Sequence, residues 1–222
     1  MLMEKNITSK REITTAQNKQ TLLLALLVRM GSERFEEIKI TSLCKDVSLS
    51  EASFYNYFPQ KTDILVYFIQ LWSIEIAWKL KYEYTFSGLE AIERLFKETA
   101  RSTVEHPTQL AEIIAFLARL ETVEEWPQIS TADKLVAYPE YEGVENIVDE
   151  GLDRLLIPDL ESAVKQGELP PQTPVKIIAL AVASLFFGVP MFVTRQAPVH
   201  NLEEIFNEQL QLIWNGARKQ YH

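Results

Sequence analysis

The run of residues 50–61 concentrates side chains that can bind nucleic-acid bases. Asn56 carries an amide suited to two hydrogen bonds with adenine, and Glu51 carries a carboxylate suited to the amino group of cytosine. Ala52 is small enough to contact a thymine methyl group, and Ser53 keeps the same helix face small and polar. The pattern predicts a helix that reads base edges, and the alternative is an ordinary solvated helix face.

Other residues of the same run are suited to the phosphate backbone. Tyr55, Tyr57 and Lys61 carry donors for phosphate oxygens, which fix the register of a protein on DNA. Lys61 falls where a long helix is expected to begin, and anions are favoured at a helix N-terminus. We therefore expect these three residues to position the DNA backbone, although a lone lysine is a weak signal.

Local signals predict the helix that carries these side chains. Ser50 is a preferred N-cap residue, and Leu49 can pack against Phe54 as a hydrophobic staple. Pro59 ends the helix after Phe58, because proline disfavours a helical conformation in the residue before it. Helical spacing puts Phe54 and Phe58 on a core-facing side and the polar residues outside.

A second short helix is predicted over about 39–47. Ile40, Leu43, Cys44 and Val47 follow the i, i+3, i+4, i+7 pattern of one apolar face. Cys44 is therefore expected to be buried packing and not a redox or metal group, since no ligand partners lie nearby. Two short helices within 39–58, joined by a tight turn, form a helix-turn-helix pattern in which the second helix enters the major groove.

Two longer helices flank this pattern. The first is expected from about Thr15 to Met30, where Leu22 to Val28 is continuously apolar and Gly31 ends the helix. The second is expected from about Gln60 to Lys81, with apolar residues at helical spacing. That helix is long enough to join a small head to a separate body.

The segment 40–65, ITSLCKDVSLSEASFYNYFPQKTDIL, resembles the signature of TetR-family transcriptional regulators. Its most specific part is Ser50-x-x-Ser53-Phe54-Tyr55-x-Tyr57-Phe58-Pro59-x-Lys61, followed by Ile64-Leu65. The resemblance is sharp over about residues 15–75, and beyond them only the number and order of helices agree.

Three departures from the family pattern stand out. Ile38-Lys39 occupies the place of a common threonine, so Lys39 would contact phosphate as a point charge. Val47-Ser48 replaces Ala-Gly in the turn, so Ser48 must take the backbone conformation of that glycine. Glu51 stands where a basic residue is frequent.

The rest of the chain is predicted to be further helices, over about 89–106, 108–124, 142–166, 174–196 and 202–219. Residues 127–141 carry the least clear pattern. The resemblance implies a homodimer, with the last two helices in an intersubunit four-helix bundle and the middle helices around an effector pocket. The implied dimer candidates, which equally suit an intrachain core, are Ile178, Ala181, Val182, Leu185, Phe186, Val189, Ile205, Leu212 and Ile213. The candidate pocket aromatics are Trp72, Phe96, Phe116, Trp126 and Tyr141.

Charge and composition restrict the function further. The net charge of −9 is uneven, since residues 1–62 carry +2 and the remainder −11, so any contact with DNA must lie near the N-terminus. The three histidines are scattered, and no metal-ligand spacing, phosphate loop or nucleophile elbow occurs, so we expect no enzyme, metal or cofactor. The N-terminus lacks the apolar core of a signal peptide, and the single cysteine suits the cytoplasm.

The uncharged run from Ile177 to Val193 raises the alternative of a membrane span. It is near the lower length limit, contains Gly188 and Pro190, and lacks a basic flank, so burial in a dimer interface is the better explanation.

The sequence thus predicts an all-α fold. A three-helix head with the helix-turn-helix occupies residues 15–75, and a long helix joins it to a helical ligand-binding and dimerisation domain over 76–222. The expected function is a cytoplasmic repressor, released from a palindromic operator by a small, largely apolar effector. The alternative is a DNA-binding dimer without an effector, controlled by a protein partner or acting as an activator.

Overall fold

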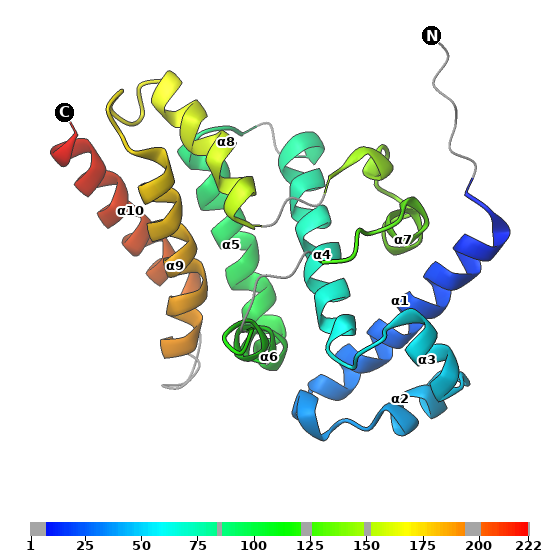
Figure 1. Cartoon of the computed structure of the whole chain (residues 1–222). Coiled ribbons are helices and arrows are strands. Elements are labelled where there is room, and N and C mark those ends of the chain that lie inside the picture. Colours follow the sequence, from blue (N-terminus) through cyan, green and yellow to red (C-terminus); the bar gives the residue numbers. More distant parts are fainter. Residues whose placement is uncertain (1–7, 84–85, 121–125, 149–151, 194–200, 222) are drawn as a thin grey trace, which may run out of the picture. The chain divides into compact units, whose positions relative to one another are not determined.

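The predicted all-α class is confirmed by a computed structural model of the chain. It describes residues 8–83, 86–120, 126–148, 152–193 and 201–221, which contain ten α-helices and no β-strand (Figure 1). The chain divides into two compact units. The first contains Met1–Glu75 and Thr122–Asp149, and the second contains Ile76–Glu121 and Glu150–His222.

Helix α1 (Lys10–Met30) begins before the predicted Thr15. Its start is fixed by a capping box, in which Glu12 N donates to Ser9 Oγ (3.2 Å) and Ser9 N donates to Glu12 Oε2 (2.7 Å). These two bonds satisfy backbone donors that the first helical turn leaves unpaired. The hydrogen bonds from Ser9 also lower the pKa of Glu12.

The predicted helix-turn-helix is formed by α2 (Ile40–Asp46) and α3 (Glu51–Tyr57), after a short 3₁₀ turn over Phe35–Glu37. Ser48 has φ of +56°, the left-handed conformation expected for this glycine-like position. Leu49 N donates to Cys44 O (3.0 Å) and Ser48 N to Lys45 O (3.3 Å). This is the Schellman pattern that closes a helix C-terminus, with serine at the usual glycine site.

Aromatic and aliphatic side chains fill the core of the first unit. Phe54, Phe58 and Tyr67 are buried. The ring centre of Phe58 lies 5.4 Å from that of Phe54 and 5.6 Å from that of Tyr67. Leu22 and Leu26 of α1 are also buried. Burial on this scale stabilises a small head by about 2 kcal/mol for each large apolar side chain, before entropy costs. The core therefore fixes the side of α3 that faces inward.

Helix α4 (Asp63–Trp78) crosses from the first unit into the second between Glu75 and Ile76, and it continues as a π-helix over Lys79–Glu83. The prediction of one helix from Gln60 to Lys81 is therefore too long at its N-terminal end, whereas helical structure continues past Lys81 to Glu83. At the N-terminal end Gln60 N donates to Asp63 Oδ2 (2.7 Å), which holds the entering chain outside the helix.

The structure corrects the predicted domain assignment of one segment. Residues 122–149, assigned from the sequence to the second domain, belong to the first unit. They carry α7 (Thr131–Ala137), which packs on α1 and lies within the region of unclear pattern. A capping box between Ser130 and Asp133 begins this helix. A short 3₁₀ turn, η3 (Val144–Asn146), stands where the helix predicted from residue 142 was expected to begin.

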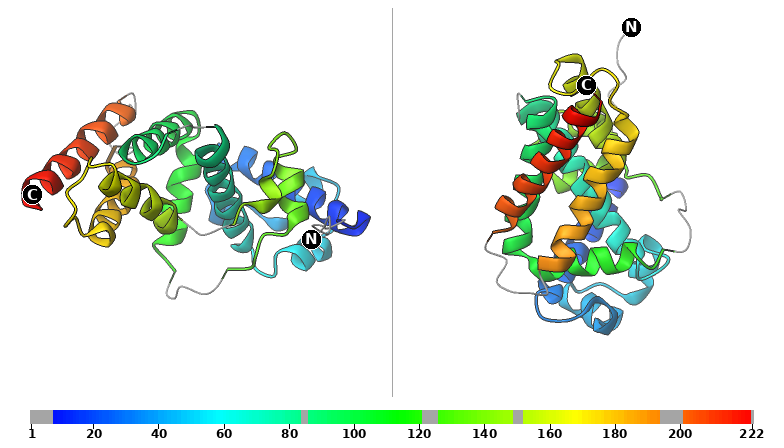
Figure 2. Two further views of the ribbon diagram at one scale, coloured as in Figure 1. Left: turned by 90° about the horizontal axis from the view of Figure 1, so that it is seen from above. Right: turned by 90° about the vertical axis from the view of Figure 1, so that its left-hand side faces the viewer.

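The second unit is a set of packed helices: α5 (Leu89–Glu105), α6 (Pro107–Leu117), α8 (Leu152–Lys165), α9 (Val175–Val193) and α10 (Leu202–Gln220). α9 and α10 lie side by side, and α5 packs on α10 (Figure 2). Phe96, Phe186 and Phe206 meet edge to face in the core, with ring centres 5.4 Å and 4.9 Å from Phe96. Helix α6 ends at Leu117, so residues 118–120 of the helix predicted to 124 are not helical, and residues 121–124 lie outside the described part of the chain. Residues 194–196 of the helix predicted to 196 also lie outside it.

Candidate nucleic-acid interface

Helix α3 has two chemically distinct faces. Phe54 is fully buried, whereas Glu51, Ala52, Tyr55 and Asn56 are exposed. Exposed groups at the start of a recognition helix are the ones that reach base edges in the major groove. Three residues predicted to read bases, Glu51, Ala52 and Asn56, are therefore exposed on α3. Tyr55, predicted to contact the DNA backbone, is exposed on the same helix.

The two serines of the recognition helix are engaged in forming it. Ser53 N donates to Ser50 Oγ (3.0 Å), and the two hydroxyl oxygens lie 2.9 Å apart. Ser50 thus satisfies a backbone donor at the helix start, as the predicted N-cap should. Ser50 remains exposed and Ser53 is half-buried.

Tyr57 is connected to α1. Its hydroxyl accepts from Asn18 Nδ2 (2.9 Å), and the side chain is half-buried. The hydroxyl hydrogen is left for a further acceptor, because a phenol both accepts and donates. Asn18 was not predicted from the sequence, since a single polar residue on α1 leaves no local signal of its partner.

Lys61 is directed toward protein and not toward an open surface. Its ammonium donates to the backbone oxygens of Phe35 and Glu36, the latter at 3.2 Å, and lies 4.5 Å from the ring centre of Phe35. Any phosphate contact by Lys61 would compete with these bonds. Lys39, by contrast, is exposed at the N-cap of α2, while Ile38 before it is buried.

The predicted effector aromatics divide between the two units. Trp72, Trp126 and Tyr141 belong to the first unit, and Phe96 and Phe116 belong to the second. Tyr141 Oη donates to Glu75 Oε1 (3.4 Å), which is a contact within the first unit. The sequence did not predict this division, because it placed Trp126 and Tyr141 in the second domain.

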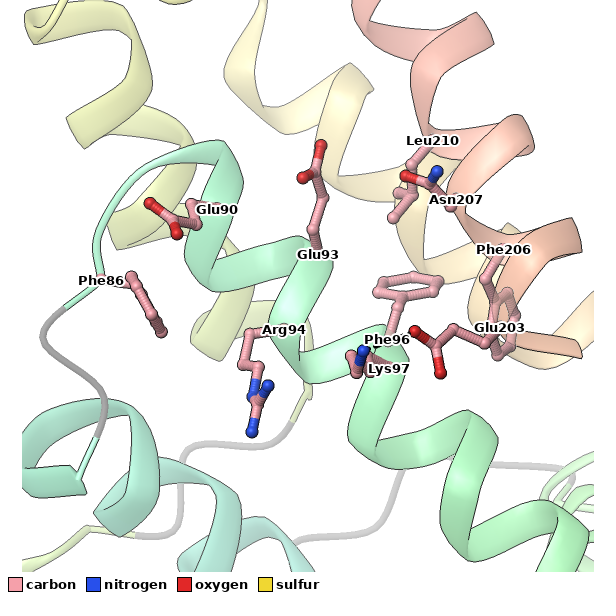
Figure 3. A pocket seen from close by; sticks show the side chains of 10 residues that line it. All are labelled: Phe86, Glu90, Glu93, Arg94, Phe96, Lys97, Glu203, Phe206, Asn207 and Leu210. Atoms are coloured by element: carbon pink, nitrogen blue, oxygen red, sulfur yellow. Dashed lines mark ion pairs between the residues drawn. The ribbon is translucent and has the colours of Figure 1, made fainter.

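The second unit has a cavity of about 250 Å³ between α5 and α10 (Figure 3). Phe96 and Phe206 contribute aromatic rings to it, and Lys97 Nζ pairs with Glu203 Oε1 (2.7 Å) at its edge. Glu93, also in its lining, accepts from Trp214 Nε1 (3.1 Å). Charged groups therefore surround this cavity.

A second cavity, of about 300 Å³, lies between α6 and α9 and is more apolar. Leu110, Ile114 and Met191 line it together with alanines of α6, and Arg119 is its charged residue. Of the five predicted aromatics, only Phe96 lines either of these two cavities.

The predicted dimer candidates differ in their burial. Ile178, Val182 and Phe186 are buried inside the chain, because this side of α9 faces the core around Phe96. Leu212 is 66% exposed. The remaining candidates are half-buried: Ala181, Leu185, Val189, Ile205 and Ile213. The sequence missed the exposed apolar residues of α9: Ile177, Leu180, Met191 and Phe192.

Helix α9 is also the described helix that is long and apolar enough to cross a membrane. Residues 175–192 have a mean hydropathy of 2.1, and 28% of this stretch is buried within the chain. Core helices of soluble proteins can have the same length and apolar composition, so this one helix is weak support for a membrane span. Ile177, Leu180, Met191 and Phe192 of α9 are exposed.

No group of three or more histidine, cysteine, aspartate or glutamate residues suited to a metal ion occurs among the described residues. Cys44 is buried, and burial raises the pKa of its thiol. A thiol with a raised pKa is a poor nucleophile, which agrees with the packing role predicted for Cys44.

Comparison with known proteins identifies the fold. The chain is similar to a protein solved for the molecular basis of control of antibiotic production by bacterial hormones, with 17% identity, a TM-score of 0.65, and 91% of this chain and 98% of that chain covered. It is also similar to the TetR family protein CprB from S. coelicolor A3(2) (17%, TM-score 0.55, 91% and 89%) and to the ketosteroid transcriptional regulator KstR2 of Mycobacterium tuberculosis (13%, 0.54, 91% and 96%). No protein-family model and no curated protein sequence matches. The chain therefore has the all-α fold of TetR-type regulators.

Proposed function

We propose that this chain is a TetR-family transcriptional regulator that binds DNA through α3. The observation that carries the proposal is the exposure of Glu51, Ala52, Tyr55 and Asn56 over the buried Phe54. Amide, carboxylate and methyl groups at this position are the chemistry that distinguishes base pairs in the major groove. The likeness to solved TetR-type structures supports the same assignment.

The backbone contacts are assigned to the residues around this face. Lys39 is exposed at the start of α2, and Tyr57 has a hydroxyl hydrogen to donate. Ser50 and Ser53 present hydroxyls beside them. Lys61 has a different proposed role, because its ammonium holds the Phe35–Glu37 turn.

The second unit is proposed to form a homodimer. Leu180 of α9 and Leu212 of α10 are 65% and 66% exposed, and a second copy of the chain would cover both. Exposed apolar surface of this kind marks an interaction site. A two-fold dimer would place its two recognition helices in successive major grooves of a palindromic operator. This explains the apolar α9 without a membrane, in a cytoplasmic protein.

The regulator is further proposed to be a repressor released by a small effector. The cavity between α6 and α9 is the candidate effector site, since its lining is mostly apolar and its volume of about 300 Å³ is at the lower end of ligand pockets. Release requires only that the effector prefer a conformer with unsuitable spacing of the two heads.

A second candidate is a DNA-binding dimer without an effector, controlled by a protein partner or acting as an activator. The other predicted pocket aromatics favour it, because Trp72, Phe116, Trp126 and Tyr141 line neither of the two cavities. A filled interior leaves less room for a ligand. Thermal shifts with a library of apolar compounds would separate the two candidates, since only an effector-binding protein is stabilised.

The DNA-binding proposal is tested by fluorescence-anisotropy titration at several salt concentrations. The probe is a duplex that the wild-type protein enriches from a random library, with a scrambled duplex for comparison. Asn56→Ala combined with Tyr55→Ala should weaken binding to the enriched duplex by about 100-fold or more, since it removes a base contact of about 1–3 kcal/mol together with the backbone contact of Tyr55. Binding to the scrambled duplex should weaken less, because only the backbone contact is lost there.

A matched control uses the same residue types elsewhere. Tyr82 and Asn146 are exposed and lie outside α3, and the exposure of Tyr82 (49%) matches that of Tyr55 (48%). Tyr82→Ala combined with Asn146→Ala should bind like the wild type. Equal loss in both double variants, or no duplex enriched by the wild type, would overturn the assignment of recognition to α3.

A further inference from the structure

A buried carboxylate ties three helices of the first unit together. Asp133 of α7 is only 4% exposed. Its Oδ2 accepts from Lys19 Nζ of α1 (2.9 Å), and its Oδ1 accepts from Tyr67 Oη of α4 (3.1 Å). One side chain of α7 therefore bonds to both α1 and α4.

Asp133 is also held by its own helix start. Ser130 Oγ donates to Asp133 Oδ2 (2.7 Å), and Ser130 N donates to the same oxygen (3.2 Å). Burial and the neighbouring Asp133 raise the pKa of Tyr67, so the phenol stays protonated and remains a donor. A carboxylate with a cation and several donors around it is one that a protein interior tolerates.

Lys19 extends this connection to the recognition helix. Its ammonium lies 4.1 Å from the ring centre of Tyr67 and 6.0 Å from that of Phe58, the residue that ends α3. The residue before it, Asn18, donates to Tyr57. Two consecutive residues of α1 thus contact the last turn of α3, and one of them is paired with α7.

We propose that Asp133, Lys19 and Asn18 are positioning residues for α3, and that docking of α7 on α1 holds the recognition helix in its DNA-binding orientation. The inference rests on the proposed function of α3. The three residues act through Tyr57 and Phe58. Removing the charge of Asp133 leaves the mostly buried Lys19 ammonium without its ion-pair partner. Lys19 is then expected to move, and the contacts between α1 and the end of α3 change with it.

The test compares Asp133→Asn and Lys19→Met with Lys19→Arg. Asparagine keeps the size and polarity of Asp133 but removes its charge, and arginine keeps the cation of Lys19. Each is titrated with the duplex enriched by the wild type and with a scrambled duplex, at a temperature where circular dichroism confirms folding. Asp133→Asn and Lys19→Met should lose about tenfold or more in affinity for the enriched duplex, and Lys19→Arg should retain it.

Two exposed residues give controls with the same change of net charge. Glu204→Gln on α10 matches the loss of a negative charge, and Lys165→Met on α8 matches the loss of a positive one. The net charge of the protein therefore changes equally in each pair. If Asp133→Asn binds the enriched duplex as tightly as Glu204→Gln does, α7 does not position α3.

A second readout needs no DNA. Hydrogen exchange of the backbone amides of residues 51–58 should be faster in Asp133→Asn than in the wild type, while exchange in residues 202–220 should be unchanged. A wild-type protein that enriches no duplex would overturn the proposed function. The exchange data would still decide whether Asp133 of α7 positions α3. Unchanged exchange at residues 51–58 would overturn the positioning role on its own.

Discussion

The ammonium of Lys61 lies 3.2 Å from the backbone oxygen of Glu36 and also donates to the backbone oxygen of Phe35. Lys61 thereby holds the turn before α2 to the chain segment before α4. A lysine at the expected N-terminus of a helix looks like an anion site in the sequence, but here the protein itself supplies the acceptors. We therefore expect Lys61 to stabilise the fold and not to bind DNA.

Lys61→Met should therefore lower stability and leave the salt dependence of DNA binding unchanged. Losing charge-assisted hydrogen bonds to backbone oxygens costs about 1–3 kcal/mol. Lys39→Met is the matched variant, because Lys39 is exposed at the start of α2. It should leave the melting temperature unchanged and reduce the slope of log K against log salt by about one. If Lys61→Met instead reduces the salt dependence and Lys39→Met lowers the melting temperature, then Lys61, and not Lys39, contacts phosphate.

Ser48→Gly should stabilise the protein. Ser48 has φ of +56°, a conformation that costs a residue with a Cβ atom about 1 kcal/mol and costs glycine very little. The expected gain is about 0.5–1 kcal/mol in the free energy of unfolding, measured by urea titration. Ser102→Gly on the exposed face of α5 should do the reverse, destabilising the protein by about 0.5–1 kcal/mol. A loss of stability in Ser48→Gly would mean that the serine side chain has a compensating role.

Local signals explain why the helix-turn-helix was predictable from the sequence. Ser50 and Pro59 begin and end α3 through their own backbone chemistry, so the observed bounds, Glu51–Tyr57, are close to the expected ones. The same kind of signal exists at Ser9 with Glu12 and at Ser130 with Asp133, where capping boxes begin α1 and α7. Neither of these two helix starts was predicted from the sequence.

Contacts between distant residues were not predictable. Lys19 and Asp133 are separated by 114 positions, and an ion pair leaves no periodic pattern in either segment. The inward side of α9 was also hidden, because a helix that is apolar all round does not indicate its core-facing side. Ile178 is therefore core, whereas Leu180 is exposed.

Asp159 should make stability depend on pH. Burial raises its pKa to about 6, although the backbone N–H of Gly88 donates to it. The unfolded pKa is about 3.9, so the folded state favours the protonated form, and this contribution is present below pH of about 4 and lost as pH rises through about 6. Asp159→Asn should be more stable than the wild type at pH near 7.5, by about 1 kcal/mol after discounting for partial solvation.

The measurement for Asp159 is urea unfolding of both proteins across this pH range. The difference in the free energy of unfolding should shrink as the pH falls through about 6 and approach zero near pH of about 3, because the wild-type carboxyl is then largely neutral in both states. A constant difference at every pH would assign the effect to packing or to the hydrogen bond with Gly88, and not to titration.

Leu180→Glu should convert the proposed dimer to a monomer. Leu180 is 65% exposed on α9, and a carboxylate there would be buried without a partner if a second copy covered it. We expect the dimer dissociation constant to rise about 100-fold or more, measured by sedimentation equilibrium. Val148→Glu places the same charge at a position that is 66% exposed in the first unit, and it should leave the dimer intact. Because a palindromic operator binds two heads together, only Leu180→Glu should also weaken binding to the enriched duplex. Unchanged sedimentation of Leu180→Glu would remove α9 from the proposed interface.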